Sequence, residues 1–83
     1  MRRDENWGVD IDRIRAFFHQ QPDVHEENGR FIFGACAISL IPLDGSAMNR
    51  WRLPRTQIIF EGDEGDVQAI HRRFFLRFLS AGG

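Results

Sequence analysis

Residues 51–79 constrain the fold most strongly, because they predict a strand, an acidic turn and a helix in direct succession. The strand is expected over about residues 51–61, and the turn over residues 62–65. Pro54 has no amide hydrogen to donate, so the strand either begins after it or lies at a sheet edge there. The helix is expected over about residues 66–79. A strand followed directly by a helix in one short chain indicates a small α+β domain.

The predicted last helix has one apolar stripe at three- and four-residue spacing, as expected for a helix packed on a sheet. The stripe consists of Val67, Ile70, Phe74 and Phe78. Acidic residues stand before and within its first turn, and Arg72, Arg73 and Arg77 stand in its later turns, so both groups complement the helix dipole. Ala69 and Leu76 lie opposite the stripe, which is compatible with an interface and equally with a single exposed leucine that needs no partner.

The amino-terminal part predicts a flexible arm over residues 1–9, which are mostly polar, and a single domain over residues 10–83. From Asp10, apolar residues at positions 11, 14 and 18 follow helical spacing, and Pro22 ends the pattern. A strand over residues 13–18 is the alternative, since Ile14, Ala16 and Phe18 also alternate. We favour the helix because Asp10 or Asp12 offers an amino-terminal cap.

The chain from residue 30 to residue 41 is almost continuously apolar, which predicts a strand buried on both faces with Gly34 as a bulge. Asn28-Gly29, just before it, marks a turn. The predicted order is therefore helix, strand, strand, helix, in a two-layer domain. Two strands make a small antiparallel sheet, so we expect either a third strand near residues 23–27 or, preferably, a homodimer that joins two hairpins.

The composition excludes several classes of protein. A length of 83 residues is near the lower limit for independent folding, and the formal net charge of −1 gives no global attraction to nucleic acid or anionic lipid. Cys36 is the only cysteine, so an internal disulfide is excluded. Without a signal-peptide pattern or an apolar run of membrane-spanning length, we expect a cytoplasmic protein with no membrane contact.

No residue pattern predicts catalysis or a cofactor. Cys36 lies in the middle of a predicted strand and is expected to be a small buried side chain rather than a nucleophile. No phosphate-binding glycine motif is present, and the glycines are assigned to turns. His19, His25 and His71 are, with Cys36, the possible metal ligands, but none has a ligand at helical i, i+4 spacing. We therefore expect no enzyme activity, no cofactor and no metal site.

The arginines allow an alternative function in nucleic-acid binding. Trp51 stands between basic residues that include Arg52 and Arg55, and three further arginines lie on the last helix. Such a set can bind phosphates and stack a base. A small nucleic-acid-associated or regulatory protein is thus the second hypothesis.

The segment 54–62, Pro-Arg-Thr-Gln-Ile-Ile-Phe-Glu-Gly, followed by Val67, Ile70 and Phe74, resembles the end of the carboxy-terminal domain of CobW-type proteins, which are GTP-dependent metallochaperones. Trp51 stands near the position of the family's tryptophan. The family's Arg-x-Lys-Gly strand motif does not occur at residues 30–34, and its GTP-binding domain is absent.

The resemblance implies a non-enzymatic accessory module that binds itself or another protein. The predicted interaction residues are Trp51, Arg52, Arg55, Arg72, Arg73, Leu76 and Arg77.

Overall fold

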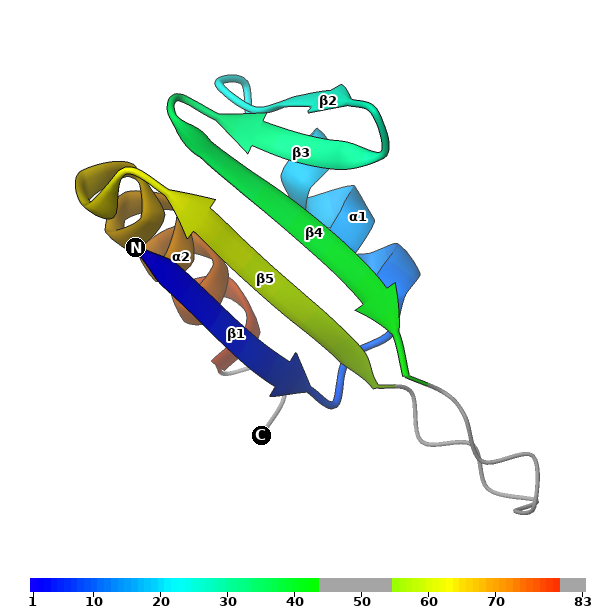
Figure 1. Ribbon diagram of the computed structural model, residues 1–83. Coiled ribbons are helices and arrows are strands. Elements are labelled where there is room, and N and C mark those ends of the chain that lie inside the picture. Colours follow the sequence, from blue (N-terminus) through cyan, green and yellow to red (C-terminus); the bar gives the residue numbers. More distant parts are fainter. Residues whose placement is uncertain (44–54, 80–83) are drawn as a thin grey trace, which may run out of the picture.

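A computed structural model describes residues 1–43 and 55–79. In these residues the elements are β1 (Arg2–Trp7), α1 (Ile11–His19), β2 (His25–Glu27), β3 (Arg30–Phe33), β4 (Cys36–Pro42), β5 (Thr56–Gly62) and α2 (Glu64–Leu79). The strands form one antiparallel sheet in the order β1-β5-β4-β3-β2, and both helices lie on the same side of it (Figure 1). The α+β class is confirmed, whereas the order helix, strand, strand, helix is wrong.

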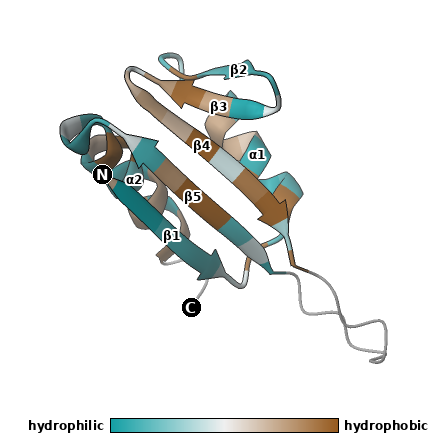
Figure 2. Ribbon diagram, viewed as in Figure 1, coloured by the Kyte–Doolittle hydropathy of each residue, from teal (hydrophilic) through white to brown (hydrophobic). Residues whose placement is uncertain are grey.

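The amino-terminal segment, expected to be a flexible arm, contains the edge strand β1. It pairs with β5 from Arg2 opposite Glu61 to Trp7 opposite Thr56. Its side chains alternate between exposed and half-buried positions along the strand. Figure 2 shows β1 as hydrophilic next to β5, which is apolar in its middle. The sequence pattern does not predict this strand, because the half-buried positions include Arg3 and Glu5, which hide the usual alternation of apolar and polar residues.

The apolar run of residues 30–41 is a hairpin and not a single strand with a bulge. Gly34 has a positive φ of 56° and begins the two-residue turn between Phe33 and Cys36, which are opposite each other. Phe31 consequently lies opposite Ile38, and both are buried in the core. The prediction of one strand with a bulge at Gly34 was wrong, because the turn reverses the chain and places both side chains on the same face of the sheet.

A second tight hairpin joins β2 to β3. Asn28 and Gly29 have positive φ values of 53° and 77°, the pattern of a type I′ turn, and they confirm the predicted Asn-Gly turn. β2 lies within residues 23–27, where a third strand was considered. The sheet therefore reaches five strands within the described residues without a second copy, and the homodimer stays a prediction.

The core lies between the sheet and the two helices. α1 is a helix, as favoured from the sequence, with Asp10 at the N-cap position but without a capping hydrogen bond from its side chain. The Phe18 and Phe74 rings stack with centroids 5.9 Å apart and join α1 to α2. The predicted stripe of α2 is buried: Val67, Ile70, Phe74 and Phe78 are each at most 1% exposed. Burial of aromatic rings supplies much of the stability of so small a domain.

Polar contacts fix the start of α2. Asp63 caps the helix by accepting a hydrogen bond from the Asp66 amide at 3.1 Å. Asp66 in turn accepts a hydrogen bond from the Ala35 amide at 2.8 Å, which ties the helix to the β3–β4 turn. Gly62, at the end of β5, has φ +141° and passes close to Ala35. Neither helix of the described residues is long and apolar enough to cross a membrane.

Candidate functional site

The last turns of α2 expose apolar side chains. Six large apolar residues are exposed in the described chain, and three of them, Phe75, Leu76 and Leu79, lie here. Their exposed fractions are 38%, 57% and 53%. We call these three residues the α2 end patch. The patch directly precedes residues 80–83, Ser-Ala-Gly-Gly.

The charge of α2 beyond its first turn is wholly positive. Residues 67–79 contain three arginines and no carboxylate. Arg73 donates two hydrogen bonds to Asp23, at 2.8 and 2.9 Å, and these lower the pKa of the Asp23 carboxyl. The Arg77 guanidinium lies 5.3 Å from the centroid of the Phe78 ring. Within residues 1–43 and 55–79, Arg72 and Arg77 have no carboxylate partner, so both charges face solvent beside the α2 end patch.

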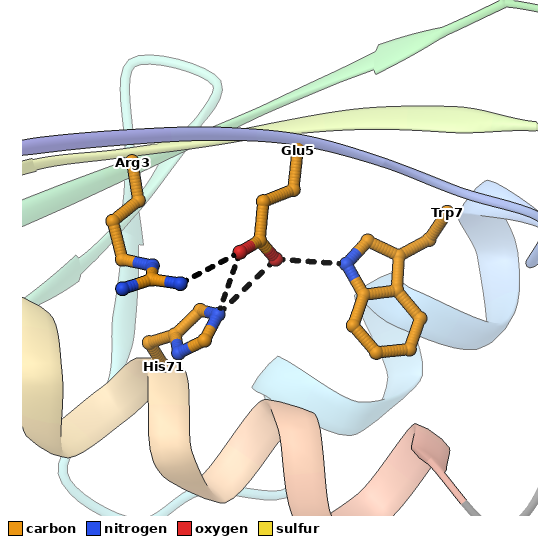
Figure 3. A network of polar contacts seen from close by, with 4 residues as sticks. All are labelled: Arg3, Glu5, Trp7 and His71. Atoms are coloured by element: carbon orange, nitrogen blue, oxygen red, sulfur yellow. Dashed lines mark hydrogen bonds and ion pairs between the residues drawn. The ribbon is translucent and has the colours of Figure 1, made fainter.

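A polar network holds α2 against β1 (Figure 3). Glu5 accepts hydrogen bonds from Trp7 Nε1 at 2.9 Å and from Arg3 at 3.0 Å. His71 Nε2 lies 3.1 Å from both carboxylate oxygens of Glu5, and it donates because an ionised carboxylate only accepts. The Trp7 ring contacts Phe75 with centroids 5.8 Å apart. The network therefore fixes both the helix and one member of the α2 end patch.

The pKa of Glu5 reflects a balance between burial and hydrogen bonding. Partial burial raises this pKa, but the hydrogen bonds from Trp7, Arg3 and His71, with the charge of His71, lower it by more. The net effect is a pKa below the ordinary value. Glu5 thus remains ionised near neutral pH and keeps its three donors in place.

The structure brings only some of the predicted interaction residues together. Arg72, Arg73, Leu76 and Arg77 all lie on α2 and are exposed. Arg55 directly precedes β5, and its carbonyl accepts a hydrogen bond from the Leu43 amide at 2.9 Å. No described contact joins Arg55 to the α2 arginines. Trp51 and Arg52 lie outside the described residues, so the predicted arginine and tryptophan patch stays a prediction.

The possible metal ligands lie apart from one another. His19 contacts Glu26 at 3.0 Å, and His25 contacts Glu27 at 3.2 Å, whereas His71 is engaged with Glu5. In the part of the chain that the structure describes, no three His, Cys, Asp or Glu side chains are grouped to hold a metal ion.

Cys36 does not have the properties of a nucleophile. It is 1% exposed, as its strand position predicts. Burial, with a smaller contribution from the Asp66 charge, raises the pKa of its thiol. Because the thiolate is the reactive form, a raised pKa and a buried sulfur both make this residue inert.

The described residues form a small α+β domain that exposes an apolar, basic surface at the end of its last helix. A family model described as "Archaeal MoaD-like protein" matches residues 3–83, and the chain therefore belongs to this family. Comparisons with curated proteins and with solved structures gave no match. The CobW-type resemblance is wrong, and so is the accessory function that it implied, because a different family accounts for nearly the whole chain. The nucleic-acid alternative gains no support.

The glycine pair Gly82-Gly83 was not among the predicted site residues. The glycines were assigned to turns, a role that the structure supports for Gly29 and Gly34. The pair differs from these because it follows the last amphipathic helix within a few residues. That position was a signal available from the sequence, although its meaning depends on the family.

Proposed function

We propose that the protein is a ubiquitin-like sulfur carrier, in which the carboxyl group of Gly83 carries sulfur as a thiocarboxylate. Membership of the MoaD-like family over residues 3–83 is the observation that carries this proposal. On this proposal Gly82-Gly83 would supply the group on which the chemistry takes place. The protein itself is a carrier and not an enzyme, and its partners are other proteins. We place it in the cytoplasm, where ATP is available.

The sulfur would be loaded in two steps. First, a carboxylate oxygen of Gly83 attacks the α-phosphorus of ATP in a partner enzyme, and pyrophosphate leaves. Second, hydrosulfide attacks the resulting acyl-adenylate at the carbonyl carbon, and AMP leaves with the electron pair of the broken C–O bond. The resulting thiocarboxylic acid loses its proton to solvent to give the thiocarboxylate, and no oxidant or reductant is consumed. The carboxylate needs this activation because its negative charge makes it a poor electrophile.

Glycine suits this role on steric grounds. Two residues without side chains form the narrowest peptide, which can enter a tight channel and adopt backbone conformations that other residues avoid. The folded domain supports the proposal by what it exposes: a stable α2 that ends a few residues before the pair. The domain needs no catalytic group of its own, which agrees with the inert environment of Cys36.

Intact-mass spectrometry tests the proposal. The protein is incubated with ATP, hydrosulfide and the purified adenylating enzyme encoded in the same genome. We expect a mass increase equal to the replacement of one oxygen by sulfur, located by fragmentation at Gly83. Removal of Gly83 should abolish the increase. Gly8→Ala is a matched control, because a Cβ at Gly8 meets no atom within 4 Å.

Three results would contradict the proposal: an unchanged mass, a modification located on Cys36, or a natural protein whose mature chain does not end at Gly83. The last is measured on protein purified from its own host. It decides whether the reacting carboxyl group exists.

A further inference from the structure

We propose that the enzyme that activates Gly83 docks on the α2 end patch through an apolar recess bordered by carboxylates. Phe75, Leu76 and Leu79 would fill the recess, and the carboxylates would pair with Arg72 and Arg77. This inference rests on the proposed function and names the surface that such an enzyme must recognise. It is argued from three independent features: the reach of the chain, the exposed apolar area and the charge.

The covalent reach of the chain forces the partner close to α2. Only residues 80–83 separate Leu79 from the carboxyl group of Gly83. Four residues span at most about 14 Å, even when fully extended. An enzyme that encloses the Gly83 carboxyl together with ATP must therefore bring its own surface to the last turn of α2.

The apolar side chains at this point are exposed but well positioned. Phe75 is in edge contact with Trp7 and stacks on His71 with centroids 6.0 Å apart. Because His71 is hydrogen-bonded to Glu5, the Phe75 ring that stacks on it is held in place before any partner binds. An apolar group that is already ordered loses little conformational entropy on binding. Leu76 and Leu79, more than half exposed, add apolar area beside it.

The charge of the surface specifies the chemistry of the partner. Arg72 and Arg77 flank the patch, and residues 67–79 contain no carboxylate to neutralise them. Arg73 differs, since Asp23 occupies its guanidinium. A partner with carboxylates at the border of its recess would pair with the two available arginines, which favours association at low salt.

A second copy of this chain fits the surface less well. A two-fold interface places the same patch against itself, so arginines of one copy would approach those of the other. Like charges brought together at an interface are unfavourable, and the patch carries no carboxylate to offset them. An activating enzyme of acidic, apolar character is therefore the occupant that we infer.

ATP–pyrophosphate exchange by the adenylating enzyme of the same genome tests the inference, with the full-length protein as the varied substrate. We expect Leu76→Ser and Arg72→Glu each to raise the KM for the carrier protein roughly tenfold and to leave kcat nearly unchanged. A tenfold change corresponds to about 1.4 kcal/mol of binding free energy, which is typical of one contributing interface residue. The matched control is Leu43→Ser, another exposed apolar residue at 37%, and its KM should equal that of the wild type. Thermal unfolding of each variant verifies that the fold is retained.

The outcomes separate the two proposals. If the wild type supports exchange but both α2 variants keep its KM, the docking surface is wrong and the sulfur-carrier function stands. If KM rises equally for Leu43→Ser, the effect is not specific to α2 and the inference also fails. If the wild type supports no exchange and no sulfur reaches Gly83, the proposed function fails, and the inference fails with it.

Discussion

The two ends of α2 differ in how their side chains are used. At the start, Asp63 and Asp66 make defined hydrogen bonds, and Gly62 passes against the backbone of Ala35. At the end, Leu76 and Leu79 have no such engagement, and more than half of each side chain is exposed. The start joins the helix to two turns of the sheet, whereas the end leaves apolar area uncovered.

This difference indicates where the molecule tolerates change. The first end is held by close contacts, and a substitution that adds an atom there would bring that atom against the backbone or a charged group. The second end is marked by exposed apolar side chains. They contribute little to folding, and their contact with water is unfavourable unless a partner covers them. The Glu5 network lies between the two ends and connects α2 to β1. Four changes test this contrast, from the largest expected effect to the smallest.

Gly62→Ala should cause the largest loss of stability. The new Cβ would lie 2.0 Å from the Ala35 carbonyl oxygen, and φ at this position is +141°. Because the obstacle is backbone, we expect a loss of about 3 kcal/mol or more in the free energy of unfolding. Urea denaturation measures it. Gly8→Ala is the control and should stay within about 0.5 kcal/mol of the wild type. Equal urea midpoints for Gly62→Ala and Gly8→Ala would show that the contact between Gly62 and Ala35 is not tight.

Asp66→Ala should have a smaller but clear effect at the same end. It removes the acceptor of the Ala35 amide and one acidic residue of the first turn. We expect a loss of about 1–2 kcal/mol, measured by the same denaturation. Glu64→Ala is the matched control, because the described contact of its carboxylate is with Gln68 at 3.3 Å on the surface. An equally large loss of stability in Glu64→Ala would mean that the acidic charge at the start of the helix, and not the hydrogen bond from the Ala35 amide, stabilises the fold.

Glu5→Gln should remove part of the acid sensitivity. The folded pKa of Glu5 lies below its ordinary value of 4.5, so the ionised group stabilises the fold above that pH. This contribution is lost as pH falls below 4.5 and through the folded pKa. We expect the wild type to lose more stability than Glu5→Gln across this acidic window. Unfolding curves at several pH values measure the slopes. Parallel slopes would contradict the role of the network.

Leu76→Ser should leave stability nearly unchanged, within about 0.5 kcal/mol, because its side chain is already 57% exposed. The same denaturation series that detects Gly62→Ala provides the comparison. A large loss would indicate that Leu76 is part of the core, and the contrast between the two ends would then disappear. An unchanged midpoint together with the raised KM described above would instead separate folding from docking.

Local patterns predicted the parts of the fold that depend on near neighbours. The stripe of α2, the helix from Asp10, the Asn28-Gly29 turn and the buried Cys36 all follow from spacing and residue type. The strand β1 was missed because two of its three half-buried side chains, Arg3 and Glu5, are charged, and Glu5 has its partner His71 on a distant helix. The β3–β4 hairpin was missed because one glycine in an apolar run is compatible with both a bulge and a turn. Only the pairing of Phe33 with Cys36 distinguishes them.

The candidate site divides in the same way. Leu76 and the α2 arginines were found from the helical pattern, since opposite faces of a helix follow directly from 3.6 residues per turn. The grouping of Phe75 with Trp7, His71 and Glu5 was not found, because Glu5 and His71 are 66 residues apart in the chain. Gly82-Gly83 is visible in the sequence, but a pair of glycines predicts no chemistry unless the domain that precedes it is known.

The sequence by itself therefore determined the helices, their buried faces and the α+β class, because these depend on the order of apolar and polar residues within a few turns or strands. Tertiary structure alone decided that a polar amino-terminal segment becomes a strand. It also decided that a charged Glu5 is half-buried and that the two ends of α2 differ. The physical reason is that hydrogen bonds and ion pairs between distant residues offset the cost of burying charge. Which distant residues meet is fixed only when the whole chain folds.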